Sequence, residues 1–441
     1  MEPIIAIVIL ILLMTSGVPV AWSFAGVLGF LVWAYDINTT TLFLQGFRGL
    51  NSVILLALPL FILVGYLMQS GGIASRLINF MEATVRGRKT GLGAAMIMSS
   101  GIFGAISGVA TAAVASIGTI MIDPLAERGY PRGYSSALLG ISSLLGILIP
   151  PSVTLILFGV VTRQSITALF AATIVPGMIL MVGLIIYNNI VSRVYIKEHE
   201  ARLLAEGSTK HLERSQVERD GFWKTTRKAF PALMMPIIIL GGIYGGFATP
   251  TEAAAVAVFL AVFVGFFIYR DLTLGKFKNS IIKAGETTGS IAMILLFSMM
   301  IGRIMVAESV PQELTNAVTT LTENKIAILI LVNLFLIFVG MIMDDISVTV
   351  VIAPLFLPLL KSVGVDPVHY ASIVTCSVVI GANSPPMASI LYLACKIGKA
   401  PIHEAMGPAI RLMAFVALPV MILITFVPSL SLWLPRLIGA Y

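Results

Sequence analysis

Long uncharged apolar stretches recur along almost the whole of this chain, and they constrain its fold more than any motif does. Hydrophobic residues make up 58% of the 441 residues and charged residues only 11%. A soluble domain carries about 25% charged residues, so this chain cannot cover itself with a water-exposed surface. Its length allows roughly ten helical crossings of about 20 residues each. We therefore expect an all-α integral membrane protein.

Composition and motifs also exclude several functions. The net charge of +7 is typical of membrane proteins whose cytoplasmic loops are basic, so it does not indicate nucleic-acid binding. The two cysteines, Cys376 and Cys395, lie in apolar stretches without metal-ligand spacing, and the sequence contains no HExxH, CxxC, P-loop or GxGxxG motif. We expect no enzyme activity. The first apolar run, from Pro3, has no basic segment before it and is not a typical secretory signal.

Glycines and prolines recur at a nearly constant spacing, which indicates an internal repeat. Pro150-Pro151 and Pro385-Pro386 lie 235 positions apart. Spacings of 231 to 237 positions also separate Pro19 from Pro250, Gly65 from Gly302, Pro124 from Pro358, and Gly146 from Gly381. We divide the chain into a first repeat over 3–195, a polar cytoplasmic connector over 196–232 and a second repeat over 233–441.

Each repeat predicts the same series of elements. The first has helices at 4–16, 19–35 and 50–70, a helical hairpin at 91–127, a broken helix at 134–163 and a helix at 168–192. The second has helices at 233–247, 250–270 and 286–306, a hairpin at 326–360, a broken helix at 370–396 and a helix at 405–432. A repeat crosses the membrane five times if its hairpin is re-entrant and seven times if the hairpin arms span fully. Both numbers are odd, so the two repeats have inverted topology.

Basic residues predict the orientation. Following the crossings from one end places 21 of the 28 lysines and arginines on one side and five on the other. By the positive-inside rule the richer side is the cytoplasm. We expect a multi-pass protein of the bacterial inner membrane with both termini in the periplasm.

The broken helices predict a binding site. A proline pair inside an apolar helix leaves upstream carbonyl groups without donors, and such breaks persist only against protein or a cavity. The carbonyls near Gly146–Pro150 and Gly381–Pro385 suit a sodium ion. The half-helices that begin at Ser152 and after Pro386 suit an anionic group.

The two hairpin tips have different chemistry. Small residues from Ser107 to Thr111 form the first tip, whereas Asp344 and Asp345 lie in the second. Two adjacent carboxylates in an apolar stretch are costly unless they are paired, hydrated or ion-bound. They bind the coupling cation or polar substrate groups, or they belong to a solvated loop. Arg303, inside another apolar stretch, is either a substrate ligand or an interfacial anchor.

These segments resemble the large membrane subunit, the DctM-like family, of tripartite ATP-independent periplasmic (TRAP) transporters. The resemblance covers nearly the whole chain and is carried by SGVATAAVASIGTIMIDPLAERGY, LLGILIPPSVTLILFGV, LGGIYGGFATPTEAAAVAVFLA, GMIMDD, GVDPVHYASIV and PSLSLWLPRL. It implies an elevator mechanism with scaffold and transport domains. It also implies sodium coupling, a small four-helix membrane subunit (DctQ-like), a periplasmic substrate-binding protein (DctP-like) and a small organic anion, a carboxylate or a sulfonate.

The resemblance also assigns site residues. Asp344 matches the family's intramembrane aspartate, and the substrate ligands are expected among Arg303, Asp344, Asp345, Ser152, Asn383 and Ser384. The sodium ligands are expected near Ser107, Gly146, Ile149 and Pro150 in the first repeat, and near Gly340, Gly381 and Pro385 in the second. This chain departs from the family pattern at Asp345 and at the break sequence GANSPP.

Three rival functions remain for comparison. An intramembrane enzyme needs a nucleophile–base set or a GxGD-type aspartate, and the sequence has neither. A channel usually has a repeated filter or a ring-forming polar helix, whereas this chain has inverted repeats with broken helices. A stand-alone sodium-coupled carrier has similar hairpins, and only the family resemblance argues against it.

Overall fold

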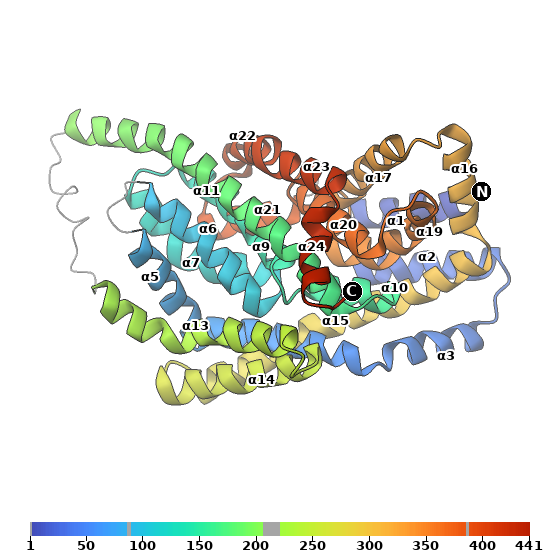
Figure 1. Ribbon diagram of the computed structural model, residues 1–441, viewed down its shortest axis with the longest axis horizontal. Coiled ribbons are helices and arrows are strands. Elements are labelled where there is room, and N and C mark those ends of the chain that lie inside the picture. Colours follow the sequence, from blue (N-terminus) through green and yellow to red (C-terminus); the bar gives the residue numbers. More distant parts are fainter. Residues whose placement is uncertain (1, 86–89, 206–220, 385–387) are drawn as a thin grey trace.

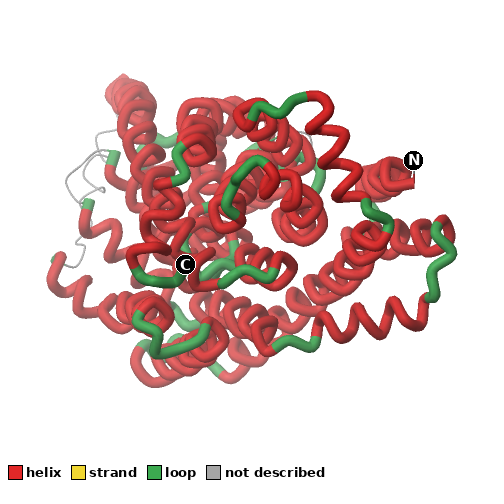
Figure 2. The backbone as a smooth tube through the Cα atoms, turned by 45° about the vertical axis from the view of Figure 1, so that its right-hand side comes forward, coloured by secondary structure: helices red, strands yellow, loops and turns green. Residues whose placement is uncertain are grey.

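The computed structural model describes residues 2–85, 90–205, 221–384 and 388–441, and these residues are helical with no strand among them (Figure 2). Seven of the helices are long and apolar enough to cross a membrane. An eighth candidate is a pair, Arg132–Leu148 and Val153–Thr162, bent by 43°. The predicted all-α membrane fold is confirmed, and the bent pair is the broken helix predicted at 134–163.

The helices pack in two groups, which meet where α5 (Ile73–Thr84) contacts α13 of the first and α6 of the second. The long helix α11 (Ile166–Ala205) contacts α6 and α20, both in the second group (Figure 1). The first group comprises α1 (Glu2–Thr15), α2 (Val20–Ala34), α3 (Thr39–Leu50), η1 (Val53–Leu56), α4 (Ala57–Ser70), α13 (Phe222–Tyr244), α14 (Pro250–Phe263) with η2 (Val264–Ile268), and α15 (Leu274–Ala307). The second comprises α6 (Gly91–Ser107), α7 (Ala110–Glu127), α8 (Arg132–Ser143), α9 (Leu145–Leu148), α10 (Val153–Thr162), α17 (Lys325–Gly340), α18 (Asp345–Ser347), η3 (Val348–Ile352), α19 (Ala353–Ser362), α20 (Pro367–Asn383) and α21 (Ser389–Gly398). The predicted hairpins and broken helices therefore lie together in the second group.

Several short helices were not predicted. These are α3, α5 (Ile73–Thr84), α16 (Val310–Leu321) and α24 (Ser429–Leu437). Each mixes polar and apolar residues over 9 to 12 positions, which is too short for a span. The predicted helix at 405–432 ends earlier, as α22 (Ile402–Leu412), η4 (Met413–Ala417) and α23 (Leu418–Phe426). The connector was predicted to begin at 196, but α11 continues to Ala205, and 206–220 lie outside the described residues.

Backbone conformations recur at the spacing found in the sequence. Gly72 precedes α5 and Ser309 precedes α16, both are left-handed with φ of 73° and 58°, and each helix has 12 residues. Arg163 ends α10 and Lys399 ends α21, again left-handed with φ of 56° and 51°, and each helix has 10 residues. Non-glycine residues rarely adopt this conformation, so its recurrence supports a common origin of the two halves. Their opposite orientation across a membrane stays a prediction.

Two glycine pairs set how closely each hairpin approaches its broken helix. A Cβ atom built on Gly104 of α6 would lie 2.2 Å from the Cα of Gly146 in α9. A Cβ on Gly381 of α20 would lie 2.6 Å from the carbonyl carbon of Gly340, which ends α17. Both contacts are backbone against backbone, so no side chain can move aside to accept a methyl group. Glycine is therefore required where each hairpin meets its break.

Gly104→Ala and Gly381→Ala should each lower the thermal stability of the purified protein, because overpacking costs about 1–3 kcal/mol. Gly302→Ala is the matched control, since a Cβ there meets nothing within 4 Å. The midpoint of thermal unfolding in detergent, measured by fluorescence-detected size exclusion, reports the effect. Midpoints for Gly104→Ala and Gly381→Ala equal to that of Gly302→Ala would show that the backbone contacts are looser than described.

Candidate functional site

The first hairpin tip is bonded to the first break. Gly108 ends α6 with a φ of 66°, and a Cβ on it would lie 2.7 Å from the carbonyl oxygen of Pro151. Its own carbonyl accepts a hydrogen bond of 3.2 Å from the backbone N–H of Val153, the first residue of α10. Only glycine permits both this conformation and this approach. The tip of α6–α7 is thus held against the start of α10.

The first break has backbone and side-chain oxygens available to a cation. Pro150 and Pro151 lack N–H groups, so the carbonyls of Gly146 and Ile147 lose the donors of a continuous helix. The N–H of Ile149 donates to the carbonyl of Leu145 over 2.7 Å, which is the last regular helical bond before the prolines. Ser107, between the Gly104 and Gly108 contacts, is fully buried, and its Oγ has no hydrogen-bond partner among the described residues. The contacts of Gly104 and Gly108 thus hold the segment that contains Ser107 against the break, while the Cβ of Ser107 lies 3.1 Å from a Cβ built on Gly65 of α4. That Ser107, Gly146, Ile149 and Pro150 bind sodium stays a prediction.

A buried oxygen without a hydrogen-bond donor or a cation beside it destabilises the fold. A buried hydroxyl or carbonyl without a partner costs about 1–3 kcal/mol. Sodium accepts hydroxyl and carbonyl oxygens and needs no thiolate or imidazole. No cluster of three or more His, Cys, Asp or Glu capable of holding a metal occurs in the described part of the chain.

The second break differs from the first. The N–H of Ser384 donates to the carbonyl of Gly381 over 2.8 Å, so this carbonyl is already occupied. Ser384 also donates its hydroxyl to Ile380, over 2.8 Å. Asn383 is fully buried, and its Oδ1, which lies 3.1 Å from a Cβ built on Gly140, has no partner in the described residues. Gly340 packs on Gly381 as expected, whereas Pro385 lies outside the described residues.

The second hairpin tip carries its two carboxylates in different roles. Asp344 caps α18 by accepting the backbone N–H and the hydroxyl of Ser347. Asp345 instead accepts a hydrogen bond of 2.7 Å from the hydroxyl of Thr154, in the first turn of α10. Ser152 caps the same helix through its hydroxyl, which accepts from the N–H of Leu155. The tip of the second hairpin and the start of α10 thus meet, although they belong to different halves.

The negative charge of Asp344 and Asp345, where the second hairpin tip meets α10, has little compensation when both are ionised. A carboxylate inside a bilayer costs about 2.5–3.5 kcal/mol. The partial positive charge at a helix N-terminus returns only about 0.3–1 kcal/mol. Neither Asp344 nor Asp345 has a basic partner among the described residues, where the ion pairs join Arg76 to Asp271, Arg128 to Glu82, and Arg132 to Asp123. A cation at this tip stays a prediction.

Arg303 lies apart from the hairpin tips and the start of α10. Its guanidinium is exposed and donates a 3.0 Å hydrogen bond to the side-chain carbonyl of Gln45 in α3. Two other residues of α15, Ile301 and Met305, face a cavity on a different side of the helix. This placement favours the interfacial-anchor interpretation, and a substrate role for Arg303 stays a prediction.

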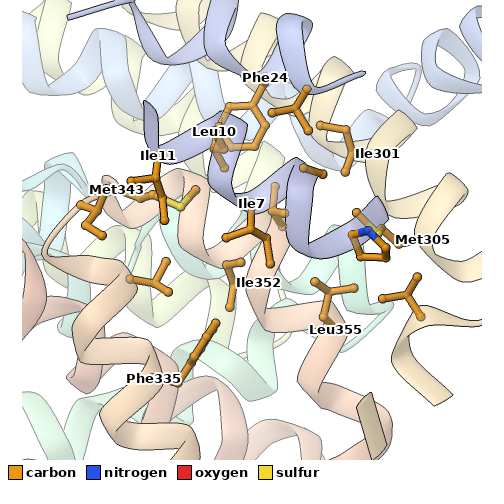
Figure 3. Close-up of a pocket in the computed structure, with 17 residues that line it drawn as sticks. Ile7, Leu10, Ile11, Phe24, Ile301, Met305, Phe335, Met343, Ile352 and Leu355 are labelled. Carbon is orange, nitrogen blue, oxygen red and sulfur yellow. The ribbon is translucent and has the colours of Figure 1, made fainter. Parts of the chain in front are cut away.

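The cavity beside α15 is not the anion site. It has a volume of about 70 Å³ and lies between α1, α2, α15 and the second hairpin. The side chains labelled in Figure 3, from Ile7 and Phe24 to Ile352 and Leu355, point into it and are apolar. A charged substrate would lose its hydration there without gaining a partner.

Three residues at the contacts between the hairpins and the broken helices were not predicted from the sequence, namely Gly104, Gly108 and Thr154. Gly104 was detectable, because Gly104 and Gly340 share the repeat spacing at 236 positions. Gly108 was visible only as part of a small-residue tip. Thr154 carried no signal, because its contact with Asp345 joins residues 191 positions apart.

Comparisons with known proteins agree with this geometry. The family described as "Tripartite ATP-independent periplasmic transporter, DctM component" matches residues 7–430. The sialic acid TRAP transporter large permease protein SiaM of Vibrio cholerae is 32% identical over 97% of this chain and 97% of its own length. The C4-dicarboxylate TRAP transporter large permease protein DctM of Pseudomonas aeruginosa is 32% identical over 94% of this chain and 93% of its own length.

A third relative is longer. The isethionate TRAP transporter permease protein DctMQ of Oleidesulfovibrio alaskensis is 33% identical over 96% of this chain, which spans 64% of that protein's length. Among solved structures, the YdaH transporter of Alcanivorax borkumensis has a similar fold, with a TM-score of 0.59 at 13% identity, covering 88% of this chain and 87% of that one. The match over residues 7–430 and the full-length relatives at 32% identity show that this chain belongs to the DctM component family of TRAP transporters, the large permease subunit.

Proposed function

We propose that this large permease subunit uses an inward sodium gradient to import a small organic anion. Its membership in the family supports transport, and the relatives are named for isethionate, sialic acid and C4-dicarboxylates, which are sulfonate or carboxylate anions. The observation that carries sodium coupling is the buried, unpartnered Ser107 hydroxyl beside a break that deprives two carbonyls of donors.

The protein acts with two partners in this proposal. The family is tripartite and periplasmic by description, so we expect a small four-helix membrane subunit and a periplasmic protein that delivers the anion. Alternating access would be of the elevator type, with the hairpin group sliding against the group that contains α4, α14 and α15. The division of the helices into two contact groups supports this mechanism. The protein would lie in the bacterial inner membrane.

Uptake in proteoliposomes tests the function directly. Vesicles containing this chain and its small partner should take up a radiolabelled anion only when the binding protein encoded beside it and an inward sodium gradient are both present. Candidate anions are isethionate, sialic acid and succinate. Uptake without any binding protein would support the alternative, a stand-alone sodium-coupled carrier. Equal uptake with sodium replaced by potassium would contradict sodium coupling.

Ser107→Ala should raise the sodium concentration for half-maximal uptake by at least about tenfold, because a direct ligand contributes roughly 1.5 kcal/mol or more. The fold should survive, since alanine removes a hydroxyl that lacks a partner. Ser99→Ala is the matched control: Ser99 is also a buried, unpartnered serine of α6, but it lies two turns away from the tip. A sodium dependence of Ser107→Ala equal to that of Ser99→Ala would remove Ser107 from the ion site.

Single cysteines test the orientation. Lys278 and Glu323 are exposed and fall on opposite sides of the proposed topology, in the cytoplasm and the periplasm respectively. Lys278→Cys should react with a membrane-impermeant maleimide only after the cells are opened, and Glu323→Cys in intact cells. Background reaction should be low because Cys376 and Cys395 are buried. The reverse labelling pattern would place both termini in the cytoplasm.

A further inference from the structure

Two arginines flank the point where α13 meets the turn that follows α14 and η2. The hydroxyl of Tyr269, in this turn, donates a 2.9 Å hydrogen bond to the backbone carbonyl of Lys228 in α13. Arg227 precedes Lys228 and Arg270 follows Tyr269, and both arginines are exposed. The ion pairs of the described residues include neither arginine. Two cations therefore lie at one junction without an acidic side chain that neutralises them in the described part of the chain.

The acidic residue next to Arg270 is already engaged. Asp271 forms an ion pair with Arg76 of α5, and its backbone carbonyl accepts a 2.9 Å hydrogen bond from the ammonium of Lys276. The Arg76 guanidinium also lies over the ring of Tyr269, 4.3 Å from the ring centre. The turn over 269–276 thus carries more positive than negative charge, and this surplus attracts anions.

The backbone at Arg270 is strained. Its φ is 59°, in the left-handed region that non-glycine residues rarely adopt and that glycine adopts freely. The residue 234 positions earlier is Asp36, which is also left-handed, with a φ of 49°. The two halves therefore keep the same turn but place opposite charges on it, and in the proposed topology Arg270 is the cytoplasmic one. An arginine at a position that suits glycine indicates a ligand for its guanidinium.

Exposed aromatic rings lie deeper in the membrane on both helices. Phe230 of α13 is 58% exposed and follows Arg227 by three residues, so the two side chains share one helix face. Phe267, which is 67% exposed, precedes Arg270 by three residues, and its ring lies 5.4 Å from that of Phe263 in α14. The helices α13 and α14 lie side by side (Figure 1). Cations above apolar rings match the charged headgroup and the acyl chains of a phospholipid.

We propose that an anionic phospholipid of the cytoplasmic leaflet binds at this junction, with its phosphate between Arg227 and Arg270 and its acyl chains over Phe230 and Phe267. Guanidinium groups bind phosphate oxygens through paired N–H groups, and two of them favour a headgroup whose charge no ammonium offsets. Because α13 also contacts α5, where the two helix groups meet, the bound lipid should stabilise the complex. The inference goes beyond anion transport, and only the choice of leaflet rests on the proposed topology.

Added lipid tests the site on the delipidated complex of this chain and its small partner in detergent. Dioleoyl phosphatidylglycerol should raise the midpoint of thermal unfolding, whereas dioleoyl phosphatidylcholine should not, because choline offsets the phosphate charge. Arg227→Gln and Arg270→Gly should each raise the phosphatidylglycerol concentration at half-effect at least tenfold. Equal stabilisation by the two lipids would overturn the proposal.

Arg270→Gly also separates the lipid site from the fold, because glycine removes the guanidinium and relieves the left-handed strain. Without added lipid, the midpoint of this variant should equal or exceed that of the wild type. Lys399→Gly is the matched control, since Lys399 is also an exposed, left-handed cation, with a φ of 51°, on the proposed cytoplasmic side. The proposal is wrong if Arg227→Gln and Arg270→Gly respond to phosphatidylglycerol as Lys399→Gly does.

Two other results are informative. Loss of the small subunit during purification of Arg227→Gln and Arg270→Gly would show that a protein covers this surface in place of a lipid, and would also overturn the proposal. The labelling of Lys278→Cys tests the orientation by itself, and uptake by the wild type tests transport. A wrong topology or a failed transport assay can therefore be told apart from a missing lipid site.

Discussion

The contact of backbone on backbone between each hairpin and its broken helix is the interaction on which the rest of this structure depends. A helix interrupted inside a bilayer leaves peptide groups that water cannot reach, so another part of the protein must cover them. Here the cover is a second helix that comes within reach only because Gly104 faces Gly146 and Gly340 faces Gly381. With a side chain at these positions, the hairpin tips could not lie against the breaks.

The two halves share this contact between hairpin and broken helix, but they differ in the polar groups beside it. In the first, the Ile149 N–H bonds to Leu145 and the tip contributes a buried hydroxyl, so oxygens without charge remain available. In the second, the Ser384 N–H occupies the Gly381 carbonyl, while the tip contributes two carboxylates. The first hairpin tip thus presents neutral oxygens, and the second presents two carboxylates, one of which bonds to the start of α10.

Sequence reasoning located what depends on local backbone chemistry. The proline pair marked the first break, where the structure has the bent helix pair. It failed where tertiary contacts decide. The short amphipathic helices α5 and α16 lack a membrane-spanning hydrophobic length. The position of Arg303 depends on which face of α15 is covered, and one sequence without its contacts cannot specify that face.

The first turn of α10 connects the two hairpins physically. Val153 gives its N–H to Gly108 in the first tip, and the next residue, Thr154, gives its hydroxyl to Asp345 in the second. A ligand that moves the first tip therefore moves the donor that orients Asp345. If a ligand at the first tip changes the affinity for a ligand at Asp345, linkage requires the ligand at Asp345 to change the affinity at the first tip by the same factor.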